Sequence, residues 1–280
     1  MQVIESVNSM QETAVRLRTQ GKLIGLVATS GSIHAGHLSL IEKAKESADV
    51  VVVSVFVNEK EFGPSEDFKR YPHDREGDLV ALEAAGVDIA FVPAPSEIYP
   101  DMFSSKVMES VRGAELCGIT RPHYFSGACT LYVKLFNVVR PDQVVMGRKD
   151  IQLASVIRKL VEDLSFPVEV VTGGVVRDPD GMAVSGRNRY LNDFQRRDAV
   201  AINGALGEGQ KLIDNGIRNV DRVLAEVTHH ITQLRRLRVI YVAAVDVETM
   251  KPMREIELGR TLIMTAVWCD EVRLTDNILV

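Results

Sequence analysis

Short apolar runs that alternate with helical segments constrain the fold of this chain more than any other feature. Residues 23–27 and 49–57 are nearly unbroken apolar runs, the second of them largely β-branched. Runs of this kind are typical of parallel strands that are covered on both faces. A helix is expected to start near His37 between them, with apolar side chains at helical spacing. The three segments together predict a strand–helix–strand unit.

The same alternation continues to about residue 176. Helices are predicted at 12–18, 76–85, 130–138 and 151–164, and strands at 87–92, 143–146 and 168–171. Such alternation predicts an α/β fold, a Rossmann-like doubly wound parallel sheet that binds its ligand at the carboxyl ends of the strands. We therefore place a first domain at residues 1–176.

Residues 177–280 predict a second, smaller α+β domain. The segment GGVVRDPDGMAVSGRNRYL at the boundary is rich in Gly, Arg and Asp and is expected to be a loop. Beyond it, the sequence predicts helices at 194–214 and 220–235, and short strands at 239–246, 255–257, 261–266 and 271–275.

Composition excludes several classes of protein. Of 280 residues, 46% are hydrophobic and 25% are charged, which is ordinary for a globular chain. The net charge of -5 disfavours a general nucleic-acid binder. Three scattered cysteines without a CxxC pair favour a reducing, cytoplasmic setting. We also expect no association with a membrane, because no apolar run approaches the roughly 18 to 20 residues of a membrane span.

The first candidate site is the loop ATSGSIHAGH, which leads from the first strand into a helix. Such a junction presents free backbone N–H groups and a positive helix dipole to a phosphate. His34 and His37 face the same side of the first helical turn, so both can donate hydrogen bonds to a phosphate as its negative charge grows. An isolated HxxH pair is more often a surface or capping pair. Its position directly after a buried strand favours the phosphate interpretation.

A second loop, MGRKD, follows the strand predicted at 143–146. Gly147 allows close backbone approach, Lys149 offers a positive charge to a phosphate, and Asp150 can hold Mg²⁺ through its oxygens. Both loops lie at the carboxyl edge of the same predicted sheet. They can therefore converge on one ligand.

A third loop, VSGR, lies at the start of the second domain. Ser185, Gly186 and Arg187 can give hydroxyl, backbone and guanidinium donors to a triphosphate. A loop between two domains can also close over its ligand. An arginine-rich turn alone would more often be a solvated linker.

The order of these loops resembles that of the pantothenate synthetase (pantoate–β-alanine ligase) family, within the HxGH nucleotidyltransferase superfamily. The resemblance extends over essentially the whole chain, through VVVSVFVN, FGPSEDFKRYP, AAGVDIAFVPAPSEIYP, KLFNVVRPD, VRDPDGMAVSGRNRYL and RLTDN. It implies an ATP- and Mg²⁺-dependent, AMP-forming ligase: a carboxylate attacks the α-phosphate of ATP, pyrophosphate leaves, and an amine attacks the acyl-adenylate to form an amide. It also implies a cytoplasmic homodimer whose first domain binds ATP and acid and whose second domain is a lid.

The resemblance also implies roles for individual residues at matching positions. His37, His34, Lys149 and Arg187 are expected to be catalytic, and Asp150 is expected to help to place Mg²⁺. The implied ATP site comprises Thr29, Ser30, Gly31, Gly36, His37, Gly147, Lys149, Asp150, Val176, Val184, Ser185, Gly186 and Arg187. The implied acid and amine pocket comprises Ala28, Ser30, Asn58, Glu61, Arg121, Tyr124 and Leu153.

The implied acid pocket departs from the family's pattern, whereas the ATP motifs persist. Ala28 and Ser30 replace a proline and a methionine, and Tyr124 replaces a histidine. Glu61 and Leu153 stand where the family has two glutamines that contact pantoate. Loss of a hydrogen bond to a buried substrate group costs about 1 to 3 kcal/mol, so two losses predict roughly hundredfold weaker use of pantoate.

These departures predict a family member that joins an acid or amine other than pantoate and β-alanine. The alternative is pantothenate synthetase itself, with a pocket re-formed around the same substrates through donors such as Tyr124 or Gln152. Alternatives of another class are an HxGH nucleotidyltransferase that makes no amide and a non-catalytic nucleotide-binding protein. Small-molecule substrates and a second copy of the chain are the expected partners, and nucleic acid is not.

Overall fold

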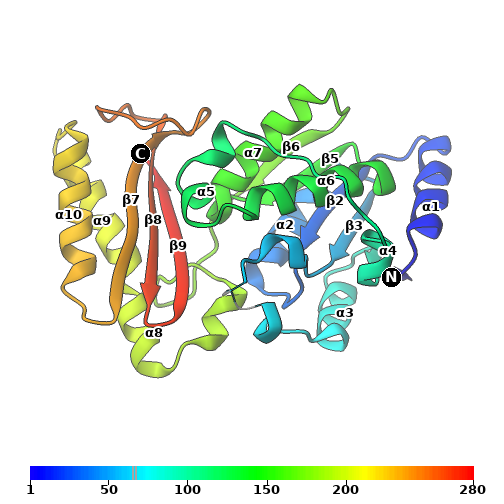
Figure 1. The fold of residues 1–280 in the computed structure, drawn as a ribbon, viewed down its shortest axis with the longest axis horizontal. Coiled ribbons are helices and arrows are strands. Elements are labelled where there is room, and N and C mark those ends of the chain that lie inside the picture. The colour runs from blue at the N-terminus through cyan, green and yellow to red at the C-terminus, as the bar shows by residue number, and fades with distance from the viewer. Residues whose placement is uncertain (65, 67) are drawn as a thin grey trace. The chain divides into compact units, whose positions relative to one another are not determined.

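The structure is a computed structural model that describes residues 1–64, 66 and 68–280. Positions 65 and 67 of the segment FGPSEDFKRYP lie outside the described residues. The chain divides into two compact units, Met1–Gly174 and Val175–Val280. The first contains a parallel sheet and the second a small antiparallel sheet (Figure 1). The predicted fold class, a doubly wound α/β sheet followed by a smaller α+β part, is confirmed.

The sheet of the first unit has the strand order β1-β4-β3-β2-β5-β6, and every pair is parallel. From β2 the chain winds outward through β3 to β4, and it later fills the other side with β5 and β6. The strand order therefore reverses between β2 and β5, and ligands of such sheets bind at this switch point. The strands are β1 Gln2–Ile4, β2 Ile24–Thr29, β3 Val50–Val55, β4 Ile89–Phe91, β5 Gln143–Gly147 and β6 Glu169–Gly173.

Helices connect these strands and bury their apolar sides against the sheet. Leu40 of α2 and Leu82 of α3 belong to one core cluster with Val53 and Val145 of the strands. The crossovers through α2 and α7 run in opposite directions along the sheet, so right-handed connections place these helices on opposite faces. The helices are α1 Val7–Thr19, α2 Ala35–Lys45, α3 Arg75–Ala84, α4 Pro95–Ile98, α5 Cys117–Thr120, α6 Tyr124–Val139 and α7 Ile151–Asp163, with short 3-10 turns η1 Glu59–Glu61, η2 Phe68–Arg70, η3 Arg112–Ala114 and η4 Arg148–Asp150.

The second unit is built on the antiparallel sheet β7-β8-β9. Helices α9 and α10 lie side by side next to this sheet (Figure 1). Leu206, Val227 and Ile263 join the helices and the sheet in one core. The elements are η5 Gly186–Tyr190, α8 Asp193–Ala199, α9 Ala201–Asp214, α10 Val220–Thr232, β7 Leu237–Asp246, β8 Thr261–Cys269 and β9 Val272–Leu279.

Two predicted elements of the second unit are wrong in kind. The single helix predicted at 194–214 is two helices that meet at Val200, where the hydrogen bonds from Val200 N to Arg196 O and from Gly204 N to Val200 O lengthen to 3.2 and 3.4 Å. Residues 255–257, all of them described, give one isolated bridge between Glu255 and Asn219 in place of the predicted strand. A bridge without neighbours forms no ladder.

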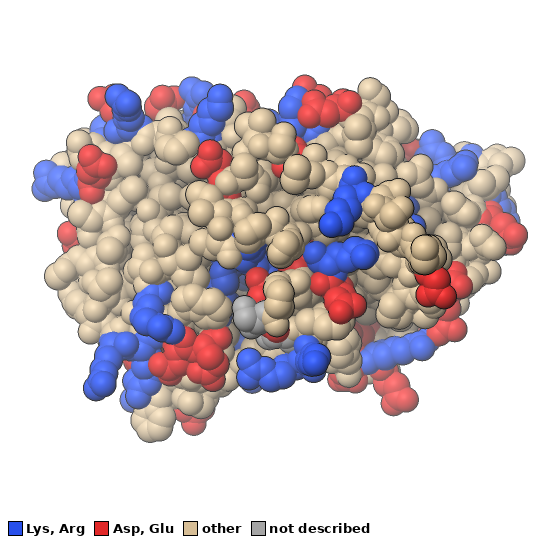
Figure 2. Space-filling view, in the orientation of Figure 1, with Lys and Arg blue, Asp and Glu red and all other residues tan. Residues whose placement is uncertain are grey.

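The surface and the helix lengths bear on the expected partners. Positive and negative side chains are interspersed over the visible face (Figure 2). Within the described part of the chain, no helix combines the length and the apolar character of a membrane span. The longest helix there, α6, has 16 residues.

The three cysteines are free thiols.

Candidate active site

The loop between β2 and α2 is held in an unusual backbone conformation. The Thr29 hydroxyl donates to Ser54 O at 3.0 Å and accepts from Gly31 N at 3.3 Å. Gly31 and Ser32 follow with φ angles of 75° and 55°, in the left-handed region. A Cβ on Gly31 would lie 2.6 Å from Asp78 Oδ2, so this position requires glycine.

A buried carboxylate that the sequence reasoning missed, Asp78, fixes this loop. Asp78 lies on α3 and is 5% exposed. Its Oδ2 accepts from Ser32 N at 2.9 Å, and its Oδ1 accepts from Ile33 N at 2.7 Å. The available signal was helical spacing, because Asp78 shares the buried face of α3 with Leu82. An acidic residue on such a face needs buried hydrogen-bond donors.

The first turn of α2 follows directly and carries both histidines. Among the described residues, no side chain caps this helix, so its first N–H groups can serve an anion. The His34 and His37 rings stack at a centroid distance of 3.9 Å. Burial lowers the pKa of His37 to about 3, with a further lowering by His34, a counteracting effect of Asp150 and a small lowering by Lys149. The imidazole of His37 is therefore neutral near pH 7 and can donate one N–H.

The second predicted loop lies beside these histidines. It begins where β5 ends at Gly147, and Lys149 Nζ lies 3.2 Å from Asp150 Oδ1. β2 and β5 are neighbouring parallel strands, and α2 packs against β5, so the HAGH and GRKD segments lie at the same edge of the sheet. The described residues contain no cluster of three His, Cys, Asp or Glu for a metal. Asp150 alone suits Mg²⁺ held mainly by nucleotide phosphates and water, since that ion commonly binds through one or two carboxylates.

Asn58, a predicted pocket residue, is buried and fully engaged by the protein. Its Nδ2 donates to Glu61 Oε1 at 2.9 Å and to Gly127 O at 3.1 Å. Its Oδ1 accepts from the Tyr99 hydroxyl at 3.0 Å. Asn58 therefore acts on the pocket by orienting Glu61.

Glu61 places a negative charge within a group of tyrosines. Burial raises the pKa of Tyr99, Tyr124 and Tyr132, and the Glu61 carboxylate raises each of them further. Asp150 also raises the pKa of Tyr124. Tyr124 is thus within electrostatic reach of both the predicted acid pocket and the GRKD loop.

Arg121, another predicted pocket residue, contacts the segment that contains Glu61 and Glu66. Its guanidinium donates to the two carboxylate oxygens of Glu66 at 2.8 and 2.6 Å, and to Glu61 O at 3.1 Å. The guanidinium carbon lies 4.1 Å from the centre of the Tyr124 ring. Arg121 therefore ties the segment around Glu61 to the start of α6.

Gln152 has no amide hydrogen left for a substrate. Its Nε2 donates to Arg112 O at 2.9 Å and to Glu115 O at 2.7 Å, and its Oε1 accepts from Cys117 N at 3.1 Å. It fastens η3 and α5 to α7 and does not supply a replacement donor. The remaining predicted pocket residues are partly buried: Ala28 and Ser30 at the end of β2, and Leu153 on α7.

The third predicted loop lies in the second unit and continues from a short hairpin. Val184 N donates to Val176 O at 2.9 Å, and the hairpin leads into η5. Ser185 Oγ accepts from Arg187 N at 3.3 Å and caps η5. The chain after Val184 thus presents Ser185 to Arg187 on a fixed turn.

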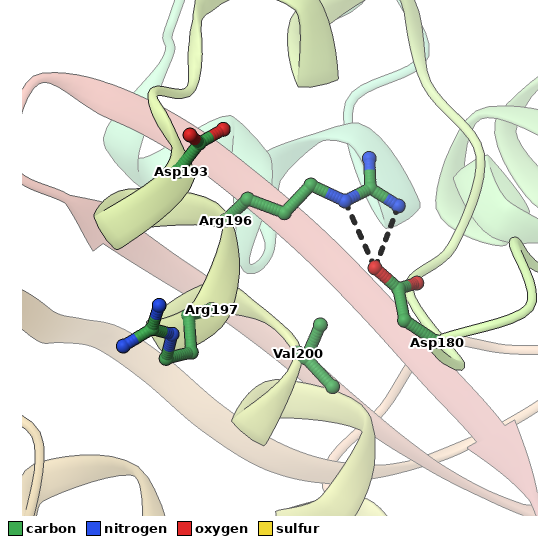
Figure 3. Close-up of a pocket in the computed structure, with 5 residues that line it drawn as sticks. All are labelled: Asp180, Asp193, Arg196, Arg197 and Val200. Atoms are coloured by element: carbon green, nitrogen blue, oxygen red, sulfur yellow. Dashed lines mark hydrogen bonds and ion pairs between the residues drawn. The ribbon is translucent and has the colours of Figure 1, made fainter.

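The pocket in Figure 3 belongs to the second unit and is lined by none of the predicted site residues. Its volume is about 390 Å³. Two arginines and two aspartates balance one another in its lining, and Arg196 is already paired with Asp180. The lining residues are Asp180, Asp193, Arg196, Arg197 and Val200.

Comparison with known proteins decides the family. The family model for pantoate–β-alanine ligase matches residues 2–279. The chain belongs to the pantoate–β-alanine ligase family. Members of this family are ATP-dependent, AMP-forming ligases that use Mg²⁺, so the predicted enzyme class and cofactors are confirmed.

Similar proteins cover the whole chain. A pantothenate synthetase from Fervidobacterium nodosum is 41% identical over 283 residues, spanning 100% of this chain and 99% of its own. One from Sulfurihydrogenibium sp. is 44% identical, with 99% of each chain covered. A pantothenate synthetase structure from Thermus thermophilus matches with a TM-score of 0.94 at 36% identity and 99% coverage of both chains.

A pantoate–β-alanine ligase from Francisella tularensis, in complex with beta-gamma ATP and β-alanine, matches with a TM-score of 0.82 at 28% identity, covering 100% of this chain and 97% of its own. The names of these family members favour pantothenate synthetase itself over the predicted ligase for a different acid or amine.

Proposed function

We propose that this ligase joins pantoate to β-alanine, with ATP converted to AMP and pyrophosphate. The observation that carries the proposal is identity of about 40% to pantothenate synthetases along the entire length. The meeting of the HAGH and GRKD loops at the switch point of the sheet supports the same chemistry.

In the first step a pantoate carboxylate oxygen attacks the α-phosphorus of ATP, and the bond to pyrophosphate breaks. The N–H groups of the first turn of α2, with the neutral imidazole of His37 and its neighbour His34, donate to phosphate oxygens as their charge grows. Lys149 neutralises phosphate charge, and by the family resemblance the Arg187 guanidinium does the same while the Ser185 hydroxyl donates a hydrogen bond. Asp150 would hold Mg²⁺ beside the phosphates, and the bound ion would neutralise further charge.

In the second step the β-alanine amine attacks the acyl carbon of the adenylate. The C–O bond to AMP breaks, the amide forms, and the amine gives up a proton to solvent. Glu61 accepts hydrogen bonds from the hydroxyl groups of pantoate, in place of the donors and acceptors of a glutamine. Leu153 offers apolar surface to the methyl groups of pantoate.

A ligase for a different acid is the second candidate. The negative charge of Glu61 among buried tyrosines favours it, because a second carboxylate disfavours an anionic substrate nearby. Such an enzyme would prefer an acid that presents a cationic or strongly hydrogen-bonding group to Glu61.

Measurement of AMP and pyrophosphate release decides between the two candidates. Enzyme with ATP and Mg²⁺ receives either pantoate with β-alanine or other acid and amine pairs, and products are identified by mass. Pantothenate as the fastest product supports the proposal, whereas faster AMP formation on another pair supports the second candidate. In the same assay His37→Ala should abolish AMP formation while its circular dichroism stays that of the wild type. Normal turnover by this variant would overturn the role of His37.

We also propose that the enzyme is a cytoplasmic homodimer. Three free thiols, two of them buried, suit a reducing compartment. The dimer is carried over from the family resemblance, and sedimentation of the full chain tests it.

A further inference from the structure

The RLTDN segment of β9, shared with the family but given no role above, bears a buried carboxylate that faces the hairpin before the third loop. The side chain of Asp276 is 5% exposed, and that of Arg177 is 25% exposed. Arg177 Nη1 donates to Asp276 Oδ2 at 2.7 Å, and Nη2 donates to Asp276 Oδ1 at 3.0 Å. Two parallel hydrogen bonds of this kind fix both the distance and the orientation of the guanidinium.

The same arginine closes the hairpin itself. Arg177 Nη1 also donates to Gly181 O at 3.1 Å, across the turn. Its backbone bridges Ala183 on the opposite arm. Gly181 has a φ of 90°, which favours glycine at this turn. One guanidinium therefore connects both arms of the hairpin to β9.

The hairpin passes this order on to the third loop. The arm that contains Ala183 continues without a break into Ser185, and the Asn188 side chain donates back to Ala183 O at 3.0 Å. The position of Ser185 to Arg187 is thus set by the arm that Arg177 and Asp276 hold. Arg196 of α8 makes a second, partly exposed contact with the turn, because it pairs with Asp178 and Asp180. Figure 3 shows its contact with Asp180.

We propose that Arg177 and Asp276 are positioning residues for ATP: their ion pair sets the geometry of the Ser185–Arg187 phosphate donors without touching the nucleotide. The inference rests on the proposed role of these donors. It does not depend on which acid or amine is joined. Removal of one partner leaves a buried charge uncompensated, so both the hairpin and the donors should shift.

The test is equilibrium binding of ATP with Mg²⁺ to the full chain, measured by calorimetry without acid or amine. Asp276→Asn should weaken ATP binding by about tenfold or more, a change that corresponds to the loss of one charge-assisted contact. Arg177→Lys, which keeps the charge but not the two parallel bonds, should weaken it by about threefold to tenfold. With an acid and amine pair that the wild-type enzyme uses, both variants should have a raised KM for ATP. Their KM for the acid should stay within about twofold of wild type.

Asp246→Asn is the matched control. Asp246 is also a buried carboxylate of the second unit. It pairs with Arg260 and accepts from Glu248 N and Thr249 N, and these three partners lie outside the hairpin. Both Asn variants should lower the thermal midpoint, but only Asp276→Asn should weaken ATP binding beyond twofold. Equal ATP affinities in the two variants would overturn the proposal.

The Arg177→Lys variant and one further variant, Arg187→Ala, keep the outcome interpretable. If Asp276→Asn does not fold, Arg177→Lys decides alone, and wild-type ATP affinity in that variant refutes the positioning role. Arg187→Ala tests the donors themselves, and unchanged ATP binding there would remove the basis of the inference. Failure of pantoate as a substrate, with weakened ATP binding in Asp276→Asn, would refute the proposed substrates and support the positioning role.

Discussion

His37 combines burial with a titratable ring, so its charge couples stability to pH. Its pKa in the folded protein, about 3, lies below the ordinary value of 6.5. Below pH 6.5 the unfolded chain therefore binds a proton that the native state does not bind, and stability falls until the pH nears 3. At pH 4.5 this effect costs about 2 kcal/mol.

We accordingly expect His37→Gln to flatten the pH dependence of stability. The free energy of unfolding in urea, measured at pH 7 and pH 4.5, should fall less in the variant than in wild type, by about 2 kcal/mol. The measurement should be made without ATP, because the phosphates of ATP would favour the protonated form of the His37 ring. An identical fall in both proteins would mean that the His37 ring titrates normally in the native state.

Asp78→Asn should separate the conformation of the nucleotide loop from its histidines. The amide places a donor against Ser32 N or Ile33 N, so the loop loses one hydrogen bond and gains a donor–donor contact. We expect the free energy of unfolding to fall by about 1 to 3 kcal/mol and the rate of AMP formation to fall by about tenfold or more. Stopped assays of AMP release with the acid and the amine at saturation measure this loss.

Asp142→Asn is the control for that prediction. Asp142 accepts from Ile24 N at 2.8 Å and pairs with Arg18, at the amino end of the same strand β2. The Asp142→Asn variant should be less stable than wild type but should form AMP at the wild-type rate. Equal slowing in both variants would show that the rate loss follows general destabilisation of the sheet.

The sequence points to candidate nucleotide-binding residues more readily than to the residues that hold their loops in place. His34, His37 and Lys149 lie in short segments that follow strands, and strand ends can be located from local composition. Asp78 accepts from backbone N–H groups and Asp276 from the Arg177 guanidinium, both far away in sequence, and their immediate neighbours do not identify those partners. Arg121, a predicted residue of the substrate pocket, pairs with Glu66, which lies 55 residues away in the sequence.

Packing of α6 against η1 depends on a glycine. A Cβ on Gly127 would lie 2.3 Å from Lys60 O and 2.7 Å from Glu61 N. Gly127→Ala must therefore push η1 away from α6, at a cost of about 1 to 3 kcal/mol. Since η1 carries Glu61, we also expect a raised KM for the acid, measured by AMP release, with the KM for ATP nearly unchanged.

Gly204→Ala, the same change in helix α9, provides the comparison. Nothing lies within 4 Å of a Cβ at Gly204. This variant should gain about 0.5 to 1 kcal/mol through the higher helix propensity of alanine. A stabilised Gly127→Ala would show that η1 has room to move and that the contact between the two elements is loose.

Apolar periodicity in the sequence locates the apolar parts of helices and strands and misses their polar parts. The helix α6 begins at Tyr124, six residues before its predicted start, and its first turns include Gly127, which packs closely against η1. Strand β9 extends to Leu279, four residues past its predicted end. The extension includes Asp276, whose charge is poorly suited to a strand until Arg177 neutralises it.

Among the described residues, each compact unit has apolar core residues of its own. Leu40, Leu82 and Val145 belong to a core of the first unit, and Leu206, Val227 and Ile263 belong to the core of the second. Units with their own cores can unfold separately. Each also contains a buried thiol, Cys129 in α6 and Cys269 in β8, and burial raises the pKa of each to about 11.

These thiols allow the two cores to be followed in one experiment. During heating, maleimide should label Cys129 and Cys269 only as their own units open, and labelling can be quantified peptide by peptide. Gly127→Ala should lower the Cys129 midpoint by about 2 to 8 °C, the shift expected when 1 to 3 kcal/mol is lost from a unit of this size. The Cys269 midpoint should stay within about 1 °C of wild type, because the substituted Gly127 lies in the first unit.

Asp246→Asn should give the opposite result, with an earlier Cys269 midpoint and an unchanged Cys129 midpoint. Parallel shifts of both thiols in either variant would contradict independent cores and would mean that the chain unfolds as one cooperative unit. Independent shifts would also explain how contacts of the second unit, such as Arg177 with Asp276, can change nucleotide binding while the parallel sheet remains intact.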